Sequence, residues 1–139
     1  MEWKPERVLS WCAYSAAWWD QPQKSEIMPP GIVVCGRKDE RNGASLLYFK
    51  QGRALGKPWL WVELAQRGHA MDHDLDRFVR AYFEAILQAR LDRHRLPKGV
   101  WLDIDQGDQV DPATIHSTLS GWIPHESLVE PWRVLNGIK

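Results

Sequence analysis

The sequence lacks most of the features that assign a function directly. It has only two cysteines, Cys12 and Cys35, and their spacing is neither CxxC nor any other zinc-type pattern. No Walker loop, GxGxxG turn, GxSxG elbow or zinc knuckle is present. These absences exclude the nucleotide-binding, serine-hydrolase and zinc-finger classes that are recognised by their motifs.

An excess of either charge is also missing, because 18 Lys and Arg balance 18 Asp and Glu. A neutral chain has no general attraction to phosphates or anionic membranes, so a nucleic acid is not the expected partner. No apolar run approaches twenty residues, and we therefore expect no membrane span. Residues 1–5 do not resemble the start of a signal peptide, which favours a cytoplasmic protein with free thiols.

The length of 139 residues predicts a single domain over 1–139. Hydrophobic spacing predicts an N-terminal helix at 5–20 and a long helix at about 72–95, with a short helix near 112–119. Strands are expected at the following ranges: 32–35, 45–50, 59–64, 100–105 and, at an edge, 132–135. Cys35 falls in the first of these strands, as a core residue.

These elements predict an α+β or α/β fold, with sheet and helices filling residues 31–135. The expected sheet is mixed and has four to five strands, and the long helix packs on one of its faces. Because a long helix separates the strands at 59–64 and 100–105, we expect them to form a right-handed βαβ crossover.

Tryptophan is unusually abundant, with nine residues. Trp59, Trp61 and Trp101 occupy alternating strand positions, and an uncovered sheet face would display them together. Acidic side chains would form the rim of this patch: Glu63, Asp103 and Asp105. Apolar centres with charged edges are typical of protein interfaces. The alternative is that these indoles are core residues beneath a helix.

Two groups of residues suggest metal chemistry instead. His69 and His73 are four residues apart at the start of the long helix, a spacing that can direct both rings at one ion. Asp103 and Asp105 share one face of a strand, where paired carboxylates can bind Mg²⁺. Such a metal-dependent nuclease or phosphohydrolase is one alternative function, although each group also fits an ordinary polar helix start or strand end.

A further alternative comes from residues 62–70 (VELAQRGHA) and 113–122 (ATIHSTLSGW). They resemble the cofactor-binding turn and the last helix of the GNAT-type N-acetyltransferases. The resemblance implies that Arg67, Gly68 and Ala70 would hold the pyrophosphate of acetyl-CoA, with Glu63 as the general base. Ala70 and Asp72 stand where that family has glycine, so the implied enzyme can be an inactive one.

The leading hypothesis from the sequence is a small, non-catalytic protein-binding module of the inhibitor, immunity or adaptor type. It needs no cofactor, and its partner is another protein that binds the Trp-rich surface. Replacing Trp61 or Trp101 by alanine separates the two roles of these residues. An interface residue loses only partner binding, whereas a core residue loses about 3–5 kcal/mol of stability.

Overall fold

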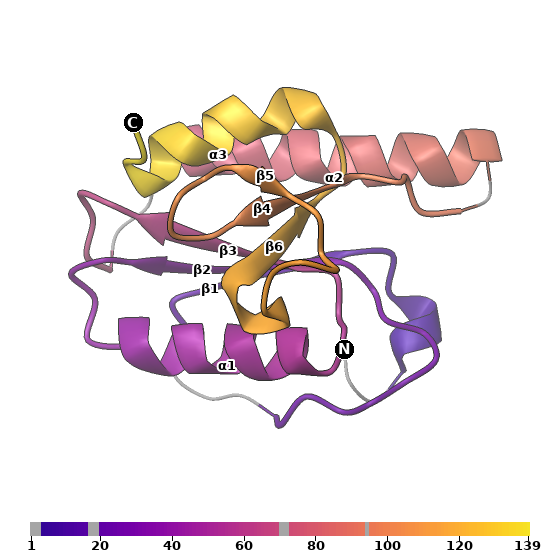
Figure 1. The fold of residues 1–139 in the computed structure, drawn as a ribbon, viewed down its shortest axis with the longest axis horizontal. Coiled ribbons are helices and arrows are strands. Elements are labelled where there is room, and N and C mark those ends of the chain that lie inside the picture. Colours follow the sequence, from indigo (N-terminus) through magenta and orange to yellow (C-terminus); the bar gives the residue numbers. More distant parts are fainter. Residues whose placement is uncertain (1–3, 17–19, 70–72, 94) are drawn as a thin grey trace.

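Helices and strands are interspersed along the chain and form a layered α/β domain (Figure 1). The computed structural model describes residues 4–16, 20–69, 73–93 and 95–139. In these residues the strands are β1 (Trp11–Tyr14), β2 (Gly31–Gly36), β3 (Trp59–Leu64), β4 (Val100–Asp103), β5 (Gln109–Val110) and β6 (Ser120–Ile123). The α-helices are α1 (Asn42–Ala54), α2 (His73–Arg93) and α3 (Val129–Asn136). Three 3-10 turns are also present: Pro5–Arg7, Ser117–Leu119 and Glu126–Leu128.

The first three strands form a parallel sheet in the order β1-β2-β3. Cys12 lies opposite Ile32, and Ile32 lies opposite Leu60. Every residue of β2 is buried, and its sequence GIVVCG contains no polar side chain. Continuous apolar runs of this kind are typical of parallel strands that are covered on both faces. The predicted strands at 32–35 and 59–64 are therefore confirmed.

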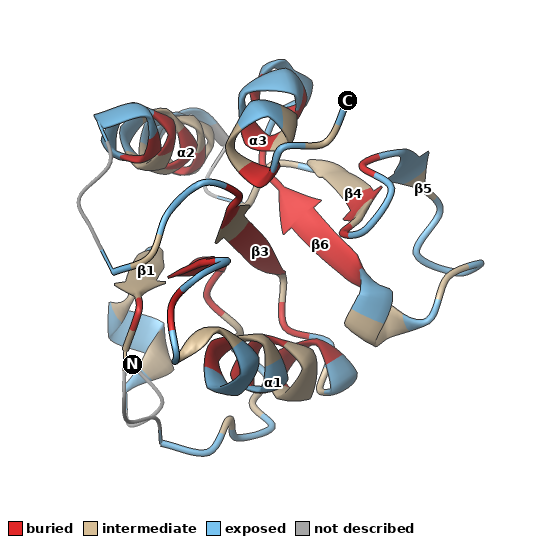
Figure 2. Cartoon of the chain, turned by 90° about the vertical axis from the view of Figure 1, so that its left-hand side faces the viewer, coloured by how far each residue is buried: buried red, intermediate tan, exposed pale blue. Residues whose placement is uncertain are grey.

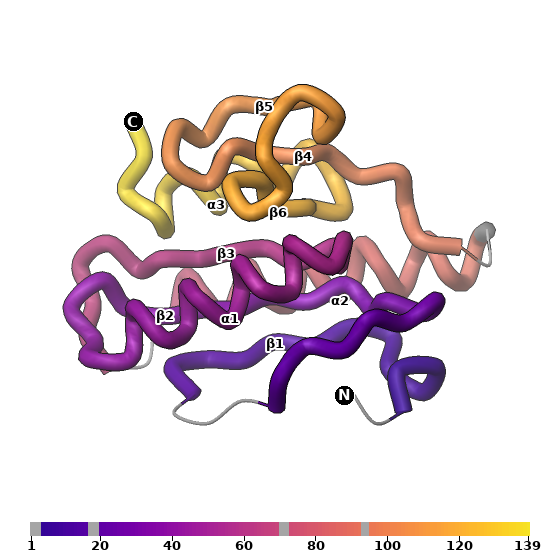
Figure 3. The backbone as a smooth tube through the Cα atoms, turned by 60° about the horizontal axis from the view of Figure 1, so that its bottom comes forward, coloured from indigo at the N-terminus to yellow at the C-terminus, as the bar shows by residue number. Residues whose placement is uncertain are grey.

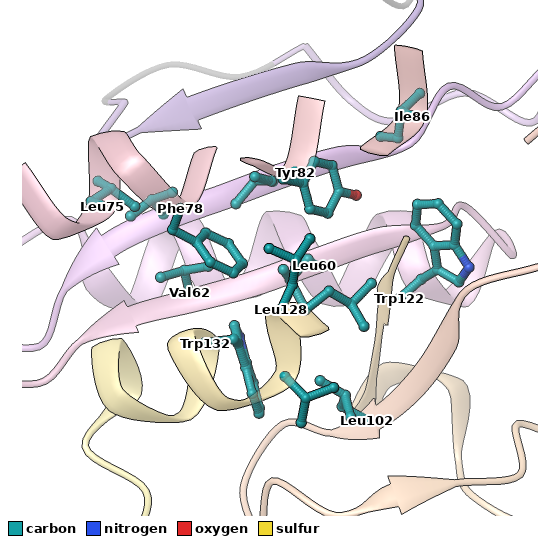
Figure 4. Close-up of a cluster of buried hydrophobic side chains, with 14 of the residues drawn as sticks. Leu60, Val62, Leu75, Phe78, Tyr82, Ile86, Leu102, Trp122, Leu128 and Trp132 are labelled. Carbon is teal, nitrogen blue, oxygen red and sulfur yellow. The ribbon is translucent and has the colours of Figure 1, made fainter. Parts of the chain in front are cut away.

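The two faces of this sheet are covered by different helices (Figure 2). On one face α1 packs against side chains that alternate along β2 and β3, namely Val33, Cys35, Trp59 and Trp61. On the other face α2 and α3 enclose the larger core cluster, which includes Leu60, Val62, Phe78, Tyr82 and Trp132 (Figure 4). The long helix predicted at about 72–95 is thus confirmed over His73–Arg93, and so is its packing on the sheet.

The remaining strands form a second, antiparallel sheet in the order β5-β4-β6. Trp101 of β4 lies opposite Val110 on one side and Trp122 on the other. This sheet packs beside β3, where Gly121 approaches Leu60 so closely that a Cβ would lie 3.1 Å from its side chain. The predicted single mixed sheet is therefore wrong, and so is the crossover from 59–64 to 100–105, because β4 pairs antiparallel with β5 and β6. The parallel connection runs from β2 through α1 to β3 (Figure 3).

Side chains of α3 pair with backbone groups at the outer edge of β3. The Trp132 indole donates to the carbonyl of Trp61 at 2.7 Å, and Asn136 Oδ1 accepts from the Glu63 amide at 2.7 Å. Farther along, the Ala65 amide donates to the carbonyl of Leu135 at 3.1 Å. An open edge strand exposes unpaired backbone groups, and these contacts satisfy several of them.

The N-terminal helix predicted at 5–20 is wrong in the described residues. Pro5–Arg7 form a 3-10 turn, and Trp11–Tyr14 form β1. The four residues WCAY are uncharged and short, so their pattern fits a strand as well as a helix. Pairing with β2 decides between the two. Residues 17–19 of the predicted helix lie outside the described residues.

Two predicted strands are helices. Residues 45–50 belong to α1, in which Ser45, Tyr48, Phe49 and Gly52 are buried at helical spacing. Residues 132–135 belong to α3, whose buried positions Val129, Trp132 and Asn136 also follow the helical period. In both segments the alternation of apolar and polar residues is too short to distinguish a strand from a helix.

Two boundaries near the second sheet also differ from prediction. The strand expected at 100–105 ends at Asp103. The helix expected at 112–119 is a turn followed by the 3-10 turn Ser117–Leu119. Asp111 does accept from the backbone amide of Ala113 at 2.9 Å, as an N-cap residue would, but no helix continues from it.

Candidate functional site

The tryptophans predicted to bind a partner do not form a surface patch. Trp59 is 0% exposed and Trp61 4%, because α1 covers the sheet face on which both lie. Trp101 is half-buried, and the Arg53 guanidinium lies 4.3 Å from the centre of its ring. The core alternative is therefore correct for Trp59 and Trp61. A protein-binding function stays a prediction, without the surface on which it was based.

The acidic residues of the predicted rim have local partners. Glu63 forms a 2.6 Å ion pair with Arg37, and Asp103 Oδ1 accepts from the amides of Asp105 and Gln106 at 2.8 Å. Glu63 and Asp105 do meet Trp61, around a cavity of about 170 Å³ at the end of β3. The structure thus brings part of the predicted set together, in a small polar hollow and not on an apolar surface.

The residues of the two enzymatic alternatives are only partly placed. Arg67 and Gly68 lie in the loop after β3, where the Arg67 carbonyl accepts from the Lys38 amide at 3.0 Å. Ala70 lies outside the described residues, so the acetyltransferase resemblance stays a prediction. His73 is an exposed residue at the start of α2. In the described parts of the chain, no three His, Cys, Asp or Glu side chains are grouped as metal ligands would be.

A different group of polar residues gathers at the carboxyl end of the parallel sheet. The chain leaves β2 toward α1 on one face and leaves β3 toward α2 on the other, so the two loops diverge. Figure 1 shows these loops side by side at the left of the molecule. Open parallel sheets bind their ligands in the crevice at such a divergence. We call the group formed there by Ser15, Asp39, Arg41 and His69 the sheet-edge site.

Close backbone contacts fix the two loops relative to each other. The Arg37 amide donates to the carbonyl of Leu64 at 3.1 Å, and the Lys38 amide donates to the carbonyl of Arg67, as described above. Gly36 lies where the loops touch, and a Cβ there would be 2.4 Å from the carbonyl oxygen of Gly68. Only glycine fits this contact, which holds the residues after β2 against those after β3.

Asp39 is the buried charge of the site, with a side chain that is 1% exposed. The amide of Arg41 donates to its Oδ1 at 2.9 Å. This bond is the main reason why the pKa of Asp39 is lowered from 3.8 to about 2; bonds from Ser15 and His69 and the charge of Arg41 act in the same direction. Burial opposes them, but the charged form prevails. Asp39 is therefore ionised at neutral pH.

His69 lies beside this carboxylate but faces solvent, with a side chain that is 60% exposed. Its Nδ1 lies 3.0 Å from Asp39 Oδ2 and 3.2 Å from Arg41 Nη1. A guanidinium can only donate, so Nδ1 cannot serve both neighbours. We assign the Nδ1 proton to the bond with Asp39, because a carboxylate is the strong acceptor of the two. The ring of Tyr14 lies parallel to the imidazole, with 6.2 Å between centroids.

Ser15 completes the site in a strained conformation. Its φ of 44° lies in the left-handed region, which few residues other than glycine adopt. The residue is buried, its amide donates to Val34 at 2.9 Å, and its Oγ lies 3.6 Å from Cys35 Sγ. The hydroxyl also bonds to Asp39. Strain of this kind is concentrated at functional sites, where surrounding contacts maintain it.

Of the residues in this site, the sequence pattern indicates only His69, and it suggests the wrong partner for it. His69 was paired with His73 on the basis of helical spacing, whereas its partner Asp39 is 30 residues earlier in the chain. Ser15 falls within the predicted helix at 5–20, whereas in the structure it directly follows β1. The usable signal was positional, because Asp39 and His69 both follow strands of a parallel sheet, and polar residues at such positions converge.

Comparisons with protein-family models, with curated proteins and with solved structures found no match for this chain. The class of molecule is therefore defined by its geometry: a layered α/β domain with a parallel sheet and an Asp–His pair at the carboxyl edge. Within the described residues, no helix combines the length and the apolar character required to cross a bilayer.

Proposed function

We propose that the protein is a hydrolase in which His69 acts as general base at the sheet-edge site. The observation that carries this proposal is the 3.0 Å contact between a buried, ionised carboxylate and a solvent-facing imidazole. A proton held on Nδ1 by Asp39 leaves the lone pair on Nε2, the nitrogen that can accept a proton from a reactant. This is the arrangement that a catalytic histidine requires.

The reaction that fits is attack by water on an ester. Nε2 of His69 takes a proton from water while the water oxygen bonds to the carbonyl carbon or phosphorus. The bond to the leaving oxygen breaks, and the imidazolium returns its proton to that oxygen. Asp39 remains ionised throughout and stabilises the imidazolium, as expected of a carboxylate whose pKa is about 2.

Ser15 is not the nucleophile in this proposal. Its hydroxyl bonds to the carboxylate of Asp39, and the residue is buried. An activated serine requires a hydrogen bond to the base itself. We assign Ser15 a positioning role, in which it holds Asp39 beside His69.

The experiment is hydrolysis of chromogenic probes by the whole chain. The probes are p-nitrophenyl acetate, p-nitrophenyl phosphate and bis(p-nitrophenyl) phosphate, each assayed with wild type, His69→Gln and His73→Gln. We expect His69→Gln to lower kcat on the active probe by about 100-fold or more. His73→Gln, four residues away and exposed, is the matched control and should stay close to wild type. Equal rates for wild type and His69→Gln on every probe would contradict the proposal.

A further inference from the structure

The cavity of about 170 Å³ at the end of β3 is lined by several elements, and we call it the β3-end cavity. Leu46 and Lys50 line it from α1, where a spacing of four residues places both on one helix face. Glu63 lines it from β3, Asp105 from the turn after β4, and Asn136 from α3. Figure 2 shows α1 and α3 on opposite sides of β3, with β4 and β5 beside them. Both sheets and the helices on either side of β3 thus contribute to one cavity.

Hydrogen bonds fix the wall of the cavity that carries Asp105. Asp103 Oδ1 accepts from the Asp105 amide at 2.8 Å, and the Gly107 amide donates to the carbonyl of Asp103 at 2.9 Å. Arg133 of α3 donates through Nε and Nη2 to the carbonyl of Gly107, at 3.0 and 2.8 Å. The turn after β4 is therefore held both internally and against α3. A ligand that binds a wall fixed in this way loses little affinity to ordering of the protein.

Several polar groups of the lining are already paired within the protein. Glu63 accepts from Arg37 Nε at 2.6 Å through Oε2 and from Asn42 at 3.2 Å through Oε1, so the charges of Glu63 and Arg37 balance. Asn136 uses its Oδ1 for the Glu63 amide and its Nδ2 for the carbonyl of Trp132. These groups shape the cavity, and their hydrogen bonds to one another hold it in place.

Two opposite charges of the lining differ from these paired groups. Lys50 is half-buried and Asp105 is exposed. In the part of the chain that the structure describes, neither the ammonium group of Lys50 nor the carboxylate of Asp105 has an ion-pair or hydrogen-bond partner. They line the same cavity from different elements without pairing with each other. One unpaired cation and one unpaired anion around a cavity are complementary to a ligand that carries both charges.

We infer that the β3-end cavity binds a small free amino acid, whose carboxylate contacts Lys50 and whose ammonium group contacts Asp105. A cavity of about 150 Å³ can hold a ring of roughly six carbon atoms. At about 170 Å³ the β3-end cavity therefore has room for an amino acid as small as alanine. Leu46 and Ile104 supply apolar lining for a short aliphatic side chain. The inference does not depend on the hydrolase function, because it uses none of the residues of the sheet-edge site.

The experiment is titration of glycine, L-alanine and L-serine into the whole protein at low ionic strength, with backbone amide shifts followed by NMR. We expect saturable shifts at Lys50 and Asp105. We expect binding weaker by about tenfold or more in Lys50→Gln and in Asp105→Asn, because each loses a charge-assisted hydrogen bond to the ligand. Lys98→Gln and Asp111→Asn replace exposed residues outside the cavity, so they are the matched controls and should bind as wild type does. An unchanged Tm shows that each variant is folded.

Ligands with a single charge separate a zwitterion site from a simple ion site. Acetate and methylammonium should each bind at least about tenfold more weakly than L-alanine. Acetate that binds as tightly as L-alanine would overturn the inferred ligand class. The inferred site is overturned if none of the three amino acids gives saturable shifts, or if Lys50→Gln and Asp105→Asn both bind L-alanine as wild type does. His69→Gln should retain L-alanine binding and lose hydrolysis, so either proposal can fail without the other.

Discussion

Two buried charges, Asp39 and Arg53, lie at opposite ends of the parallel strands and are held in different ways. Asp39 follows β2 at the carboxyl end, whereas Arg53 lies near the end of α1, just before β3 begins. Hydrogen bonds lower the pKa of Asp39 to about 2 and so favour its charge; burial lowers the pKa of Arg53 to about 10 and so disfavours its charge. The surroundings of Asp39 thus stabilise its charged form, whereas those of Arg53 destabilise its charged form.

The partners of the two residues explain this difference. Arg53 donates to the carbonyl oxygens of Ser120 and Lys57 and to Ser120 Oγ, and it stacks on Trp101. These contacts join α1 to the second sheet and leave no polar group of Arg53 for solvent to reach. The carboxylate of Asp39 instead contacts His69, whose side chain is largely exposed. A buried charge whose partner faces solvent can act on a ligand, and one enclosed by backbone acceptors can only stabilise the fold.

The largest expected effect concerns the uncharged core between the two ends. Trp61→Ala should lower the free energy of unfolding by about 3–5 kcal/mol, because the indole is buried beneath α1. Trp101→Ala should cost roughly half as much, since Trp101 is only half-buried. Urea unfolding monitored by circular dichroism measures both. If both substitutions change the free energy of unfolding equally and negligibly, these two tryptophans are not buried as described.

Replacement of the structural charge should have the next largest effect. Arg53→Met keeps most of the side-chain volume but leaves the Ser120 carbonyl without its donor, so we expect a loss of about 3 kcal/mol. Arg77→Met, on the exposed side of α2, is the control and should change stability by less than about 0.5 kcal/mol. Hydrolysis by folded Arg53→Met should equal that of wild type. A loss of activity in folded Arg53→Met would contradict a purely structural role for Arg53.

Asp39→Asn should cost less stability but remove function. The amide keeps the shape of the carboxylate yet turns a donor toward Arg41 or His69, which we expect to cost about 1–2 kcal/mol. Probe hydrolysis should fall at least about tenfold because the Nδ1 proton of His69 loses its acceptor. A folded Asp39→Asn that hydrolyses at the wild-type rate would show that the carboxylate is not part of the machinery.

The same variant reports the pKa of Asp39 through the pH dependence of stability. A carboxyl group with a lowered folded-state pKa stabilises the fold above its ordinary value of 3.8, and this contribution is lost as the pH falls through about 2. The stability difference between wild type and Asp39→Asn should therefore be constant above about pH 4 and shrink between about pH 4 and pH 2. Acid titration of urea midpoints measures it, and a difference independent of pH would contradict an ionised Asp39.

Ser15 should show the smallest effect. Ser15→Ala removes the bond to Asp39 and retains the unfavourable φ, for a loss of about 1 kcal/mol. Ser15→Gly removes the same bond and relieves the backbone strain, so it should be no less stable than Ser15→Ala. Thermal unfolding ranks the two variants. If Ser15→Gly is clearly the less stable, the backbone strain that we assign to Ser15 is absent.

How far the sequence could predict this molecule depends on the range of the interactions involved. The strands at 32–35 and 59–64 are rich in β-branched and aromatic residues, and the helix at 72–95 has a long apolar stripe; the structure confirms the two strands and, over His73–Arg93, the helix. Residues 11–14 and 45–50 are too short for periodicity to decide, and only pairing with β2 or packing beneath the sheet determines their structure. The Asp–His pair depends on sheet order, which local patterns do not contain.

The tautomer of His69 decides whether this residue can act as general base. It can be read from the ¹⁵N shifts of the imidazole at a pH where the ring is neutral. A free neutral imidazole carries its proton mainly on Nε2, whereas a ring held by a carboxylate at Nδ1 carries it there. We expect the Nδ1–H form in wild type and its loss in Asp39→Asn. A wild-type His69 protonated on Nε2 would have no lone pair facing the substrate and would contradict the proposed role.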